Sequence, residues 1–336
     1  MRKKISDMVN SDQGLEVVGT AKNGNEAVKE TILLKPDVVT LDLAMPKLDG
    51  LSALGYIMSE LPTPVIIVSA YSKPGAPETF TALEYGAVDF ISKPVGTISM
   101  NIDDIKQELI LKIKIAAKVD MSKIKLKLAS KDKKKIPQAK ASTKFNKIVV
   151  IGASTGGPRA LSELIPKLPA NLPAAVIVVQ HMPPDFTAAF SARLDMDSLL
   201  RVKEAAEGDV IEAGKVLVVP GDYHLELCEK GNKIVVALNK KPKVCNIRPS
   251  INVTMKSAAA LYGDKVIGVI LTGMGEDGVD GLAEIKRLGG KTIAEDKSTA
   301  IIYGMPAVAA KRGVADQILP LYSIADEIVK LVNNGK

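Results

Sequence analysis

The sequence predicts an α/β protein with two doubly wound parallel sheets, and three observations support this fold class. Strand-like runs of valine and isoleucine alternate with helix-like segments in both halves of the chain. A lysine-rich segment divides the halves. The length of 336 residues exceeds what one hydrophobic core usually serves. We therefore expect a first domain over residues 1–100, a helix and linker over 101–145, and a second domain over 146–336.

The composition is that of a soluble globular protein. Hydrophobic residues make up 46% and charged residues 25% of the chain, which excludes a largely disordered protein. Tryptophan is absent and aromatic residues make up 4%, so stacking platforms for single-stranded nucleic acid are not expected. Two cysteines without metal-ligand spacing, and no signal peptide, predict a reducing, cytoplasmic location. No apolar run is long enough for a membrane span.

The net charge of +7 comes from one segment. Residues 121–144 contain nine lysines and one aspartate, and subtracting their charge of +8 leaves the rest of the chain at −1. A basic surface for nucleic acid is therefore not expected on the folded parts. We interpret the segment as a flexible, self-repelling linker, with contact to an acidic partner as the alternative.

The first hundred residues predict alternating helices and strands. Ile5, Met8 and Val9 form one apolar face of an N-terminal helix, and a helix is expected to start near Asn23. Four strands are predicted: residues 15–20, residues 37–46 ending on Asp42, residues 64–70 ending on Ser69, and residues 86–94 carrying Lys93. This alternation is typical of a parallel, doubly wound sheet.

Asp42, Ser69 and Lys93 lie at the carboxyl ends of their strands, where function sits in such sheets. A carboxylate can attack phosphorus, an ammonium can pair with one phosphoryl oxygen, and a hydroxyl can hydrogen-bond another. Each residue alone has an ordinary alternative: a helix cap, a turn residue or a solvated lysine. Their order, D-x-x-M-P-x-x-D-G, then S-A, then K-P, favours a site for an acyl phosphate.

The motifs LDLAMPKLDG, IIVSA and DFISKP resemble the flavodoxin-like receiver domain of two-component response regulators. The resemblance implies that Asp42 is the phosphoacceptor, with Ser69, Phe90 and Lys93 as the receiver's switch residues. That family begins with a hydrophobic strand ending in an acidic pair that holds Mg²⁺, whereas this sequence begins with the following helix. We therefore expect a receiver without its first strand and without a Mg²⁺ site. Either the sequence starts at an internal methionine, or the receiver is degenerate and not phosphorylated.

Residues 101–119 predict an amphipathic helix before the linker. Asn101 can cap it, and Asp103 and Asp104 suit the positive end of the helix dipole. Lysines follow toward its other end. This helix is expected to close the first domain or to run into the linker.

The second half predicts another parallel sheet. Its candidate strands are mostly unbroken valine and isoleucine runs, as expected for strands covered on both faces. They are residues 147–152, 175–180, 215–219, 233–237, 266–272 and 291–294. Short strands and turns over residues 207–237 predict a β-hairpin insertion.

The turn after the first of these strands has two possible uses. Residues 148–161, IVVIGASTGGPRAL, predict a buried strand, a glycine-rich turn and a helix starting near Pro158. The amides of such a turn suit a bound phosphate or a serine nucleophile with its oxyanion site. Ser154 stands where the dinucleotide fingerprint needs its second glycine, and the Walker lysine is absent. The segment does match G-x-S-x-G, the nucleophile elbow.

Ser154, His181 and Asp277 follow the carboxyl ends of three predicted strands. Because these ends share one edge of a parallel sheet, the three residues are the parts of a nucleophilic triad. A structural histidine and an ordinary glycine-rich turn are the alternatives. The chain order Ser, His, Asp differs from the α/β-hydrolase order, so we favour a Rossmann-like sheet that carries its own triad.

The motifs IGASTGGP, VVQHMPPDFT, RPSINV, ILTGMGEDG and AEDKSTAIIYGMP resemble the catalytic domain of the chemotaxis protein-glutamate methylesterases, the CheB family, over residues 147 to about 330. The resemblance implies hydrolysis of glutamate γ-methyl esters on chemoreceptor helices, often with deamidation of receptor glutamines. It makes Ser154 the nucleophile, His181 the base and Asp277 the orienting acid, with the amides of Thr155 and Met274 at the oxyanion. It implies no cofactor for catalysis, and a chemotaxis histidine kinase as phosphodonor to the receiver.

Two other function classes are the alternatives. A receiver with a DNA-binding output would need a helix-turn-helix or a basic face on the second domain, and the charge distribution does not favour one. A nucleotide-dependent oxidoreductase would need the dinucleotide fingerprint, which fails at Ser154. Ester hydrolysis therefore remains the prediction for the second domain.

Overall fold

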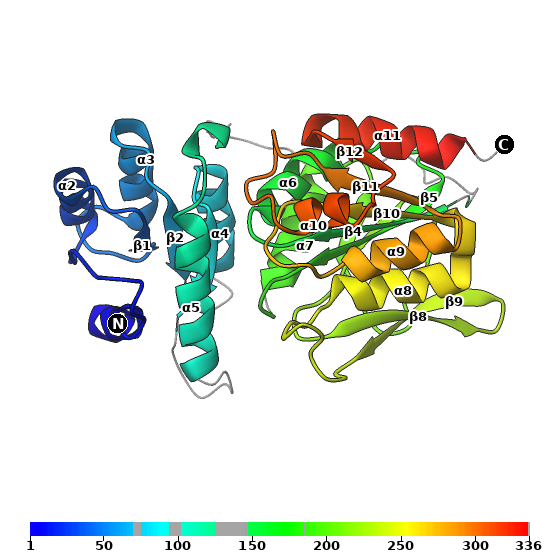
Figure 1. Ribbon diagram of the computed structural model, residues 1–336, viewed down its shortest axis with the longest axis horizontal. Coiled ribbons are helices and arrows are strands. Elements are labelled where there is room, and N and C mark those ends of the chain that lie inside the picture. The colour runs from blue at the N-terminus through cyan, green and yellow to red at the C-terminus, as the bar shows by residue number, and fades with distance from the viewer. Residues whose placement is uncertain (70–74, 94–101, 125–144, 146, 185, 335–336) are drawn as a thin grey trace. The chain divides into compact units, whose positions relative to one another are not determined.

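The computed structural model describes residues 1–69, 75–93, 102–124, 145, 147–184 and 186–334 (Figure 1). The chain forms two compact units, unit 1 over Met1–Ala129 and unit 2 over Ser130–Lys336. The predicted helix cap Asn101 and linker residues 125–144 lie outside the described residues.

Unit 1 contains a parallel sheet in the strand order β1-β2-β3, with helices packed on it. The strands are β1 (Val39–Asp42), β2 (Val65–Ser69) and β3 (Asp89–Ser92). The helices are α1 (Arg2–Asn10), α2 (Gly24–Leu34), α3 (Gly50–Glu60), α4 (Gly75–Glu84) and α5 (Ile102–Ala116), followed by the short 3₁₀ helix η1 (Met121–Lys123). Helix α5 packs on β2 and β3, which are buried throughout, and α3 packs on β1. The predicted strands that end at Asp42 and Ser69 are confirmed.

Local side chains set the starts of two helices in unit 1. Asn23 caps α2 by accepting a hydrogen bond from the amide of Glu26 at 3.1 Å. The Glu26 carboxylate accepts from the amide of Lys22 at 2.8 Å, so two backbone donors are satisfied at once. Asp49 caps α3 through the amide of Ser52 at 2.8 Å. The predicted helix start near Asn23 is therefore confirmed, with its physical cause.

The predicted strand over residues 15–20 is wrong. These residues form no strand, and the amide of Val17 donates to the side chain of Asn10 at 2.9 Å instead of to a sheet. Among the described residues, β1 has one ladder partner, β2. A cavity of about 870 Å³ is lined by residues 14–22 and by β1, among others. A strand-like pattern becomes a strand only where a neighbour supplies ladder hydrogen bonds.

Unit 2 is built on a seven-stranded parallel sheet in the order β12-β11-β10-β4-β5-β7-β6. Its strands are β4 (Lys147–Ala153), β5 (Ala174–Gln180), β6 (Arg201–Glu204), β7 (Lys215–Val218), β10 (Val266–Ile270), β11 (Lys291–Glu295) and β12 (Gln317–Leu319). Its helices are α6 (Gly157–Leu164), α7 (Phe186–Asp197), α8 (Ile251–Tyr262), α9 (Val279–Arg287), α10 (Met305–Lys311) and α11 (Leu321–Asn333), with 3₁₀ turns η2 (Ile165–Lys167) and η3 (Gly263–Lys265). The predicted parallel sheet is thus confirmed.

The hairpin insertion is narrower than predicted and lies later in the chain. Strands β8 (His224–Lys230) and β9 (Lys233–Asn239) form a separate antiparallel pair. Gly231 turns between them with φ of 60°, a value that glycine adopts without strain. Strand β7, which falls within the predicted insertion, pairs with β5 and β6 in the main sheet instead.

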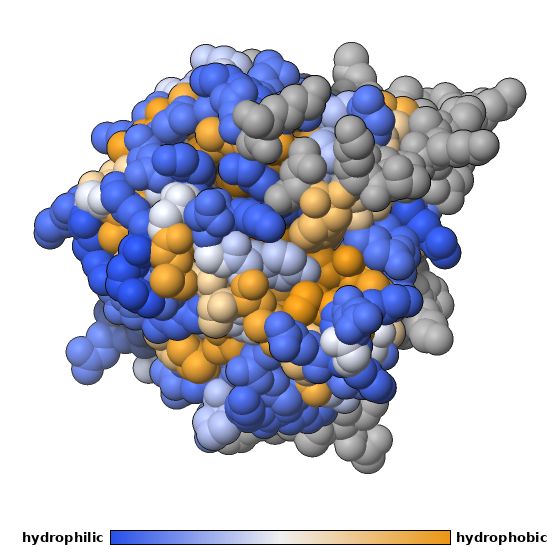
Figure 2. Space-filling view, turned by 90° about the vertical axis from the view of Figure 1, so that its right-hand side faces the viewer, coloured by the Kyte–Doolittle hydropathy of each residue, from blue (hydrophilic) through white to orange (hydrophobic). Residues whose placement is uncertain are grey.

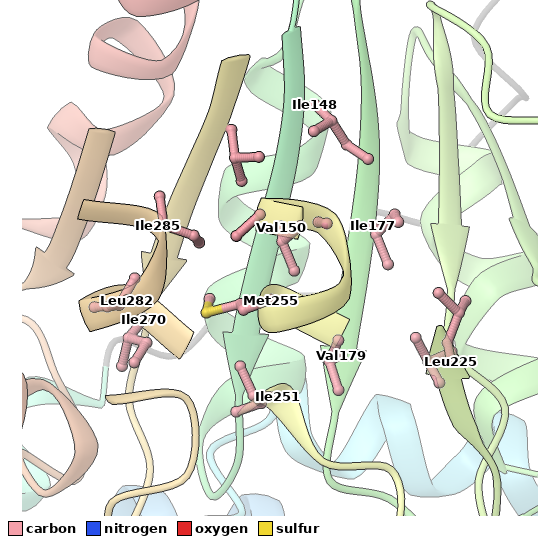
Figure 3. Close-up of a cluster of buried hydrophobic side chains, with 14 of the residues drawn as sticks. Ile148, Val150, Ile177, Val179, Leu225, Ile251, Met255, Ile270, Leu282 and Ile285 are labelled. Carbon is pink, nitrogen blue, oxygen red and sulfur yellow. The ribbon is translucent and has the colours of Figure 1, made fainter. Parts of the chain in front are cut away.

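The core of unit 2 lies between the sheet and helices α8 and α9 (Figure 3). Alternate residues of the central strands point to this face, and they meet side chains from both helices. The main contributors are Ile148, Val150, Ile177, Val179, Ile251, Met255, Leu282 and Ile285. The intervening residues Val149 and Ile151 are also 0% exposed, so both faces of β4 are covered. This explains why β4 is an unbroken apolar run.

The surface of unit 2 shown in Figure 2 is mostly hydrophilic, with hydrophobic side chains gathered near its middle. Three large hydrophobic side chains of the second half are among those that stay exposed: Met274 at 45%, Ile318 at 44% and Tyr322 at 62%. None of the helices that the structure describes is both long and apolar enough to cross a membrane.

Candidate active site

Ser154 lies where the strand order of unit 2 reverses. The chain continues from β4 to β5 on one side and later places β10 on the other side of β4. Ligands of open α/β sheets bind at the carboxyl ends of strands at such a switch point. Ser154 is the first residue after β4, and its amide donates to the carbonyl of Thr272, just beyond β10, at 3.0 Å.

The turn that carries Ser154 depends on glycine. Gly156 has φ of 78° and precedes α6, and a Cβ there would lie 2.9 Å from Cβ of Ile301. The amide of Gly157 donates to the carbonyl of Ser154 at 2.7 Å, which closes the turn. Pro158 lies in the first turn of α6, as the sequence predicts.

His181 follows β5 directly, beside the turn of Ser154. Strands β4 and β5 are in register with Ala153 opposite Gln180, and the amide of His181 donates to the carbonyl of Ala153 at 3.1 Å. The imidazole is 9% exposed, and its Nε2 lies 2.9 Å from Oδ2 of Asp277. The residues predicted as base and orienting acid therefore meet, from strands on opposite sides of β4.

Donors from the start of α8 surround the carboxylate of Asp277, whose side chain is 1% exposed. Oδ1 accepts from the hydroxyl of Ser250 at 2.7 Å and from the amide of Asn252 at 3.2 Å. Oδ2 accepts from the amide of Ile251 at 2.6 Å, in addition to facing His181. Because a helix N-terminus stabilises negative charge, this arrangement keeps a buried carboxylate ionised.

The pKa of Asp277 follows from two opposing effects. Burial by itself raises the pKa of this carboxyl, since water no longer solvates the charge. Hydrogen bonds from His181, Ser250 and Ile251 outweigh burial and hold the pKa of Asp277 below its ordinary value of 3.8. The group is therefore ionised at neutral pH and can orient an imidazole or stabilise an imidazolium.

The contact with Asp277 assigns the two ring nitrogens of His181. An ionised carboxylate only accepts hydrogen bonds, so Nε2 carries the proton and Nδ1 keeps its lone pair. Nδ1 is thus the nitrogen that can take a proton from a nucleophile. In the familiar Ser-His-Asp template Nε2 faces the serine and Nδ1 faces the aspartate. In this protein the two ring nitrogens exchange these positions, since Nε2 faces Asp277.

The loop after β10 lies against Ser154. A Cβ at Gly273 would lie 2.7 Å from Cβ of Ser154, so only glycine allows this approach. The amide of the next residue, Met274, donates to none of the described residues. Thr155 is 6% exposed, and its carbonyl accepts from the hydroxyl of Thr272 at 2.9 Å. Of the residues predicted to supply oxyanion amides, Thr155 follows Ser154 in the chain, and Met274 follows Gly273, which lies close to Ser154.

The hydroxyl of Ser154 makes no hydrogen bond to a described residue. In enzymes without substrate, catalytic hydrogen bonds are often long and tighten only in the substrate complex. The structure therefore brings Ser154, His181 and Asp277 to one edge of the sheet, with the bond between His181 and Asp277 already formed.

Two polar neighbours of the candidate triad were not predicted from the sequence. Ser250 is 0% exposed and contacts Asp277, and its position directly before the helical run INVTMK was the available signal. Gln180 is 2% exposed and donates to backbone carbonyls of Ser154 and His181. A glutamine that ends an apolar strand was its signal, because a buried polar side chain requires partners.

In unit 1 the structure brings together two of the predicted phosphoryl-site residues. Nζ of Lys93 lies 2.6 Å from Oδ2 of Asp42, and the amide of Lys93 donates to the carbonyl of Ser69 at 2.6 Å. The hydroxyl of Ser69 accepts from that of Thr79 at 2.7 Å. Asp42 and Ser69 end neighbouring strands, β1 and β2. The three residues thus lie at one edge, as the sequence predicts.

Phe90 is buried in unit 1, at 2% exposed. Its ring meets that of Phe80 edge-on, with centroids 6.3 Å apart, and Nζ of Lys112 lies 5.3 Å from its centroid. Lys112 is also paired with Asp89 at 3.2 Å and Glu108 at 3.0 Å. Burial lowers the pKa of Lys112, but these carboxylates outweigh it and hold that pKa above its ordinary value.

The described residues contain no group of three histidine, cysteine or acidic side chains that could hold a metal ion. Oδ2 of Asp42 pairs with the ammonium of Lys93, and Oδ1 accepts a hydrogen bond from the amide of Ala44 at 3.0 Å. Mg²⁺ is usually held by one or two carboxylates together with water and phosphate oxygens.

Both halves of the chain match known protein families. Residues 149–328 match the family described as CheB methylesterase, and residues 1–102 match the response regulator receiver domain. A protein from Pyrococcus abyssi named protein-glutamate methylesterase/protein-glutamine glutaminase is 48% identical over 337 residues, which cover 99% of this chain and 90% of that protein. A protein of the same name from Caldanaerobacter subterraneus is 46% identical over 344 residues, covering 99% and 94%.

A solved structure supports the fold of unit 2. The crystal structure of the Thermotoga maritima CheB methylesterase catalytic domain has a TM-score of 0.55 and 48% sequence identity. The match covers 55% of this chain and 98% of that domain.

Proposed function

Because the chain belongs to the CheB methylesterase family, we propose that it hydrolyses glutamate γ-methyl esters on chemoreceptor helices, with Ser154, His181 and Asp277 as its catalytic residues. The observation that carries the proposal is the hydrogen bond between His181 and Asp277, beside Ser154 at one edge of the sheet. A hydroxyl, an imidazole and a buried carboxylate are the groups that acyl transfer to serine requires.

In the acylation step Oγ of Ser154 attacks the ester carbonyl carbon while Nδ1 of His181 takes the hydroxyl proton. The carbonyl π bond opens and its electron pair becomes the oxyanion of a tetrahedral intermediate. When this collapses, the bond from carbon to the methoxy oxygen breaks, and His181 returns its proton so that methanol leaves. The product is a glutamyl ester of Ser154. Asp277 stays ionised and stabilises the imidazolium in between.

The amides of Thr155 and Met274 are the proposed donors to the oxyanion. Thr155 lies on the turn that carries Ser154. Met274 lies on the loop after β10, where Gly273 comes close to Ser154. The loss of one such donor typically costs roughly 3–4 kcal/mol of transition-state stabilisation. Gly273 supports this role because a side chain there would push Met274 away from Ser154.

Deacylation repeats the sequence with water as the nucleophile. Nδ1 of His181 takes a proton from water, the hydroxide adds to the acyl carbon, and Ser154 leaves with the proton that His181 returns. The glutamate carboxylate is released and the enzyme is regenerated.

Deamidation of receptor glutamines is proposed as a second reaction of the same site. The curated relatives are named as glutaminases as well as methylesterases. A glutamine side chain can pass through the same glutamyl ester, with ammonia as the leaving group in place of methanol. No additional catalytic residue is needed.

We propose that residues 1–100 form a receiver domain that controls this activity through Asp42. The contact of Asp42 with Lys93, and Ser69 at the end of the neighbouring strand, support a phosphoryl site there. The phosphodonor would be a chemotaxis histidine kinase in the cytoplasm, with residues 101–145 as the connection to a catalytic domain over residues 146–336. The proposal assigns no residue to Mg²⁺.

Replacement of the nucleophile tests the catalytic assignment. Ser154→Ala removes the attacking oxygen, and we expect methanol release from methylated receptor to fall by at least about 10³-fold. Circular dichroism should show an unchanged melting curve. Ser59→Ala, which removes an exposed hydroxyl from α3, is the matched control and should keep full activity. Retained methanol release in Ser154→Ala would refute the assignment.

A further inference from the structure

We propose that Gln180 is a positioning residue that ties the nucleophile to the base through one side-chain amide. Its Nε2 donates to the backbone carbonyl of Ser154 and to that of His181, each at 3.0 Å. The side chain is 2% exposed, so water does not compete for these bonds. The inference rests on the proposed roles of Ser154 and His181 and adds the residue that holds them in register.

The two carbonyls fix the orientation of this amide. If the side-chain amide were rotated by 180°, Oε1 of Gln180 would face the two carbonyl oxygens. Three hydrogen-bond acceptors would then meet without a donor. In the observed orientation Oε1 has no hydrogen-bond partner among the described residues. A buried amide oxygen without a donor is unfavourable, so the pair of bonds made by Nε2 is what keeps the side chain in place.

Gly157 leaves the space that Oε1 occupies. A Cβ at position 157 would overlap Oε1 of Gln180, and it would also lie 2.8 Å from Cβ of Ala153. The side chain of Gln180 therefore fits only because position 157 is a glycine. Gly157 lies three residues after Ser154, and Gln180 directly precedes His181.

The two hydrogen bonds made by Gln180 lie just beyond the last ladder bond between β4 and β5. The last ladder contact between β4 and β5 near the site is the bond from the amide of His181 to the carbonyl of Ala153. Beyond it, Gln180 supplies the connection between the two strand ends. Since a misplacement of about 1 Å can lower a rate about 100-fold, loss of this link should lower kcat more than it changes substrate binding.

Gln180→Glu keeps the shape of the side chain and removes its donors. At neutral pH the introduced carboxylate faces two carbonyls, and we expect kcat to fall about 10- to 100-fold with KM within about 2-fold of wild type. When protonated, the carboxyl can donate one hydrogen bond, so the ratio of variant to wild-type kcat should rise as the pH is lowered. A merely structural role would leave this ratio independent of pH.

A double-mutant cycle tests the pairing with Gly157. Gly157→Ala should displace the Gln180 amide and lower kcat about 10-fold or more. In a Gln180→Ala background the same change should cost at least about 3-fold less, and the remaining cost comes from the contact with Cβ of Ala153. Gly55→Ala is the matched control, because a Cβ at this exposed position in α3 meets no atom within 4 Å, and it should leave kcat unchanged.

The full-length protein is assayed in parallel on p-nitrophenyl acetate and on methylated receptor. Three outcomes would overturn the proposal. They are wild-type kcat in both Gln180→Glu and Gln180→Ala, a pH-independent ratio of Gln180→Glu to wild-type kcat, and losses in kcat that simply add in the double-mutant cycle. Hydrolysis of the small ester without methanol release from receptor would instead refute the proposed substrate, and the small ester would still decide the role of Gln180.

Discussion

Asp277 shows how a fully buried charge is kept in this protein. Four donors meet its carboxylate, and three of them come from the start of α8. Removal of one acceptor oxygen would leave buried donors unpaired. Loss of these hydrogen bonds should also lower the stability of the fold, because they connect α8 to the loop after β10.

Asp277→Asn should therefore lower stability in a pH-dependent way. The amide keeps one acceptor oxygen, and we expect a loss of roughly 1–3 kcal/mol in the free energy of unfolding at neutral pH. The unfolded carboxyl takes up a proton near 3.8, whereas the folded one does so at lower pH. The stabilisation is thus present above about pH 4 and is lost as the pH falls through the depressed value.

Urea unfolding of both proteins from neutral pH down to about pH 3 measures this difference. It should be largest at neutral pH and shrink below about pH 4. A difference that grows on acidification would contradict the ionised state assigned to Asp277.

At the scale of single residues, the sequence allowed the proposed triad to be named but not its hydrogen bonds. Ser154, His181 and Asp277 could be proposed because polar residues at strand ends interrupt apolar runs. The ring nitrogen that faces Asp277 depends on the direction from which α8 and the loop approach, and no local pattern encodes that direction. Ser250 and Gln180 act through backbone groups distant in sequence, so their partners could not be predicted.

Helix α8 is the element that connects the core to the site. Its side chains Ile251 and Met255 pack against positions that carry no side chain: a Cβ at Gly281 of α9 would lie 2.5 Å from Cβ of Met255, and one at Gly152 of β4 would lie 2.7 Å from Cδ1 of Ile251. This close packing determines how near α8 lies to β4 and α9. The first residues of α8 then donate hydrogen bonds to Asp277.

Gly281→Ala should shift α8 and weaken the site together with the fold. Alanine normally stabilises a helix interior by roughly 0.5–1 kcal/mol relative to glycine. Overpacking against Met255 costs roughly 1–3 kcal/mol, so we expect net destabilisation. Urea unfolding measures it, and kcat should fall because the donors to Asp277 move.

Gly55→Ala serves again as the comparison, since it gains the same helix propensity in α3 without a contact. A stabilised Gly281→Ala protein with normal kcat would show that α8 is not held in this way.

Among the elements, long apolar runs could be predicted and short or unpaired segments could not. Strands β4, β5 and β10 are confirmed because burial on both faces leaves an unbroken apolar pattern. Strand β11, KTIAE, is confirmed although polar residues interrupt its pattern. Strands β6 and β12 have four and three residues at the sheet edges, and polar residues interrupt their pattern. Residues 15–20 show the reverse case, a strand-like pattern without a ladder partner.

The molecule as a whole consists of two units with separate sheets, and the proposed catalytic residues all belong to unit 2. Unit 2 also supplies every donor found around Asp277. A catalytic domain from Thermotoga maritima to which this unit is similar was solved by itself. We therefore expect unit 2 to fold and to keep its activity without unit 1.

In the absence of a phosphodonor, when Asp42 is unmodified, deletion of residues 1–144 should therefore leave hydrolysis of a small ester within about 2-fold of the full chain. The deletion keeps Phe145, whose ring lies 5.6 Å from that of Tyr262 in α8. Steady-state kinetics of the two proteins on p-nitrophenyl acetate measures the effect. Strong activation would show that residues 1–144 restrain the site, and inactivation that unit 2 needs them.

The position of β4 between β5 and β10 has a consequence for how the protein becomes active. Strand β5 follows β4 closely in the chain, but β10 can pair with β4 only after more than a hundred residues have been synthesised and arranged. Contacts between distant segments form slowly, because the entropy of closing a long loop must be overcome first. We therefore expect His181 to come beside Ser154 before β10 brings Asp277 to the site. A chain that is still folding would hold a nucleophile and a base but lack the acid that orients them.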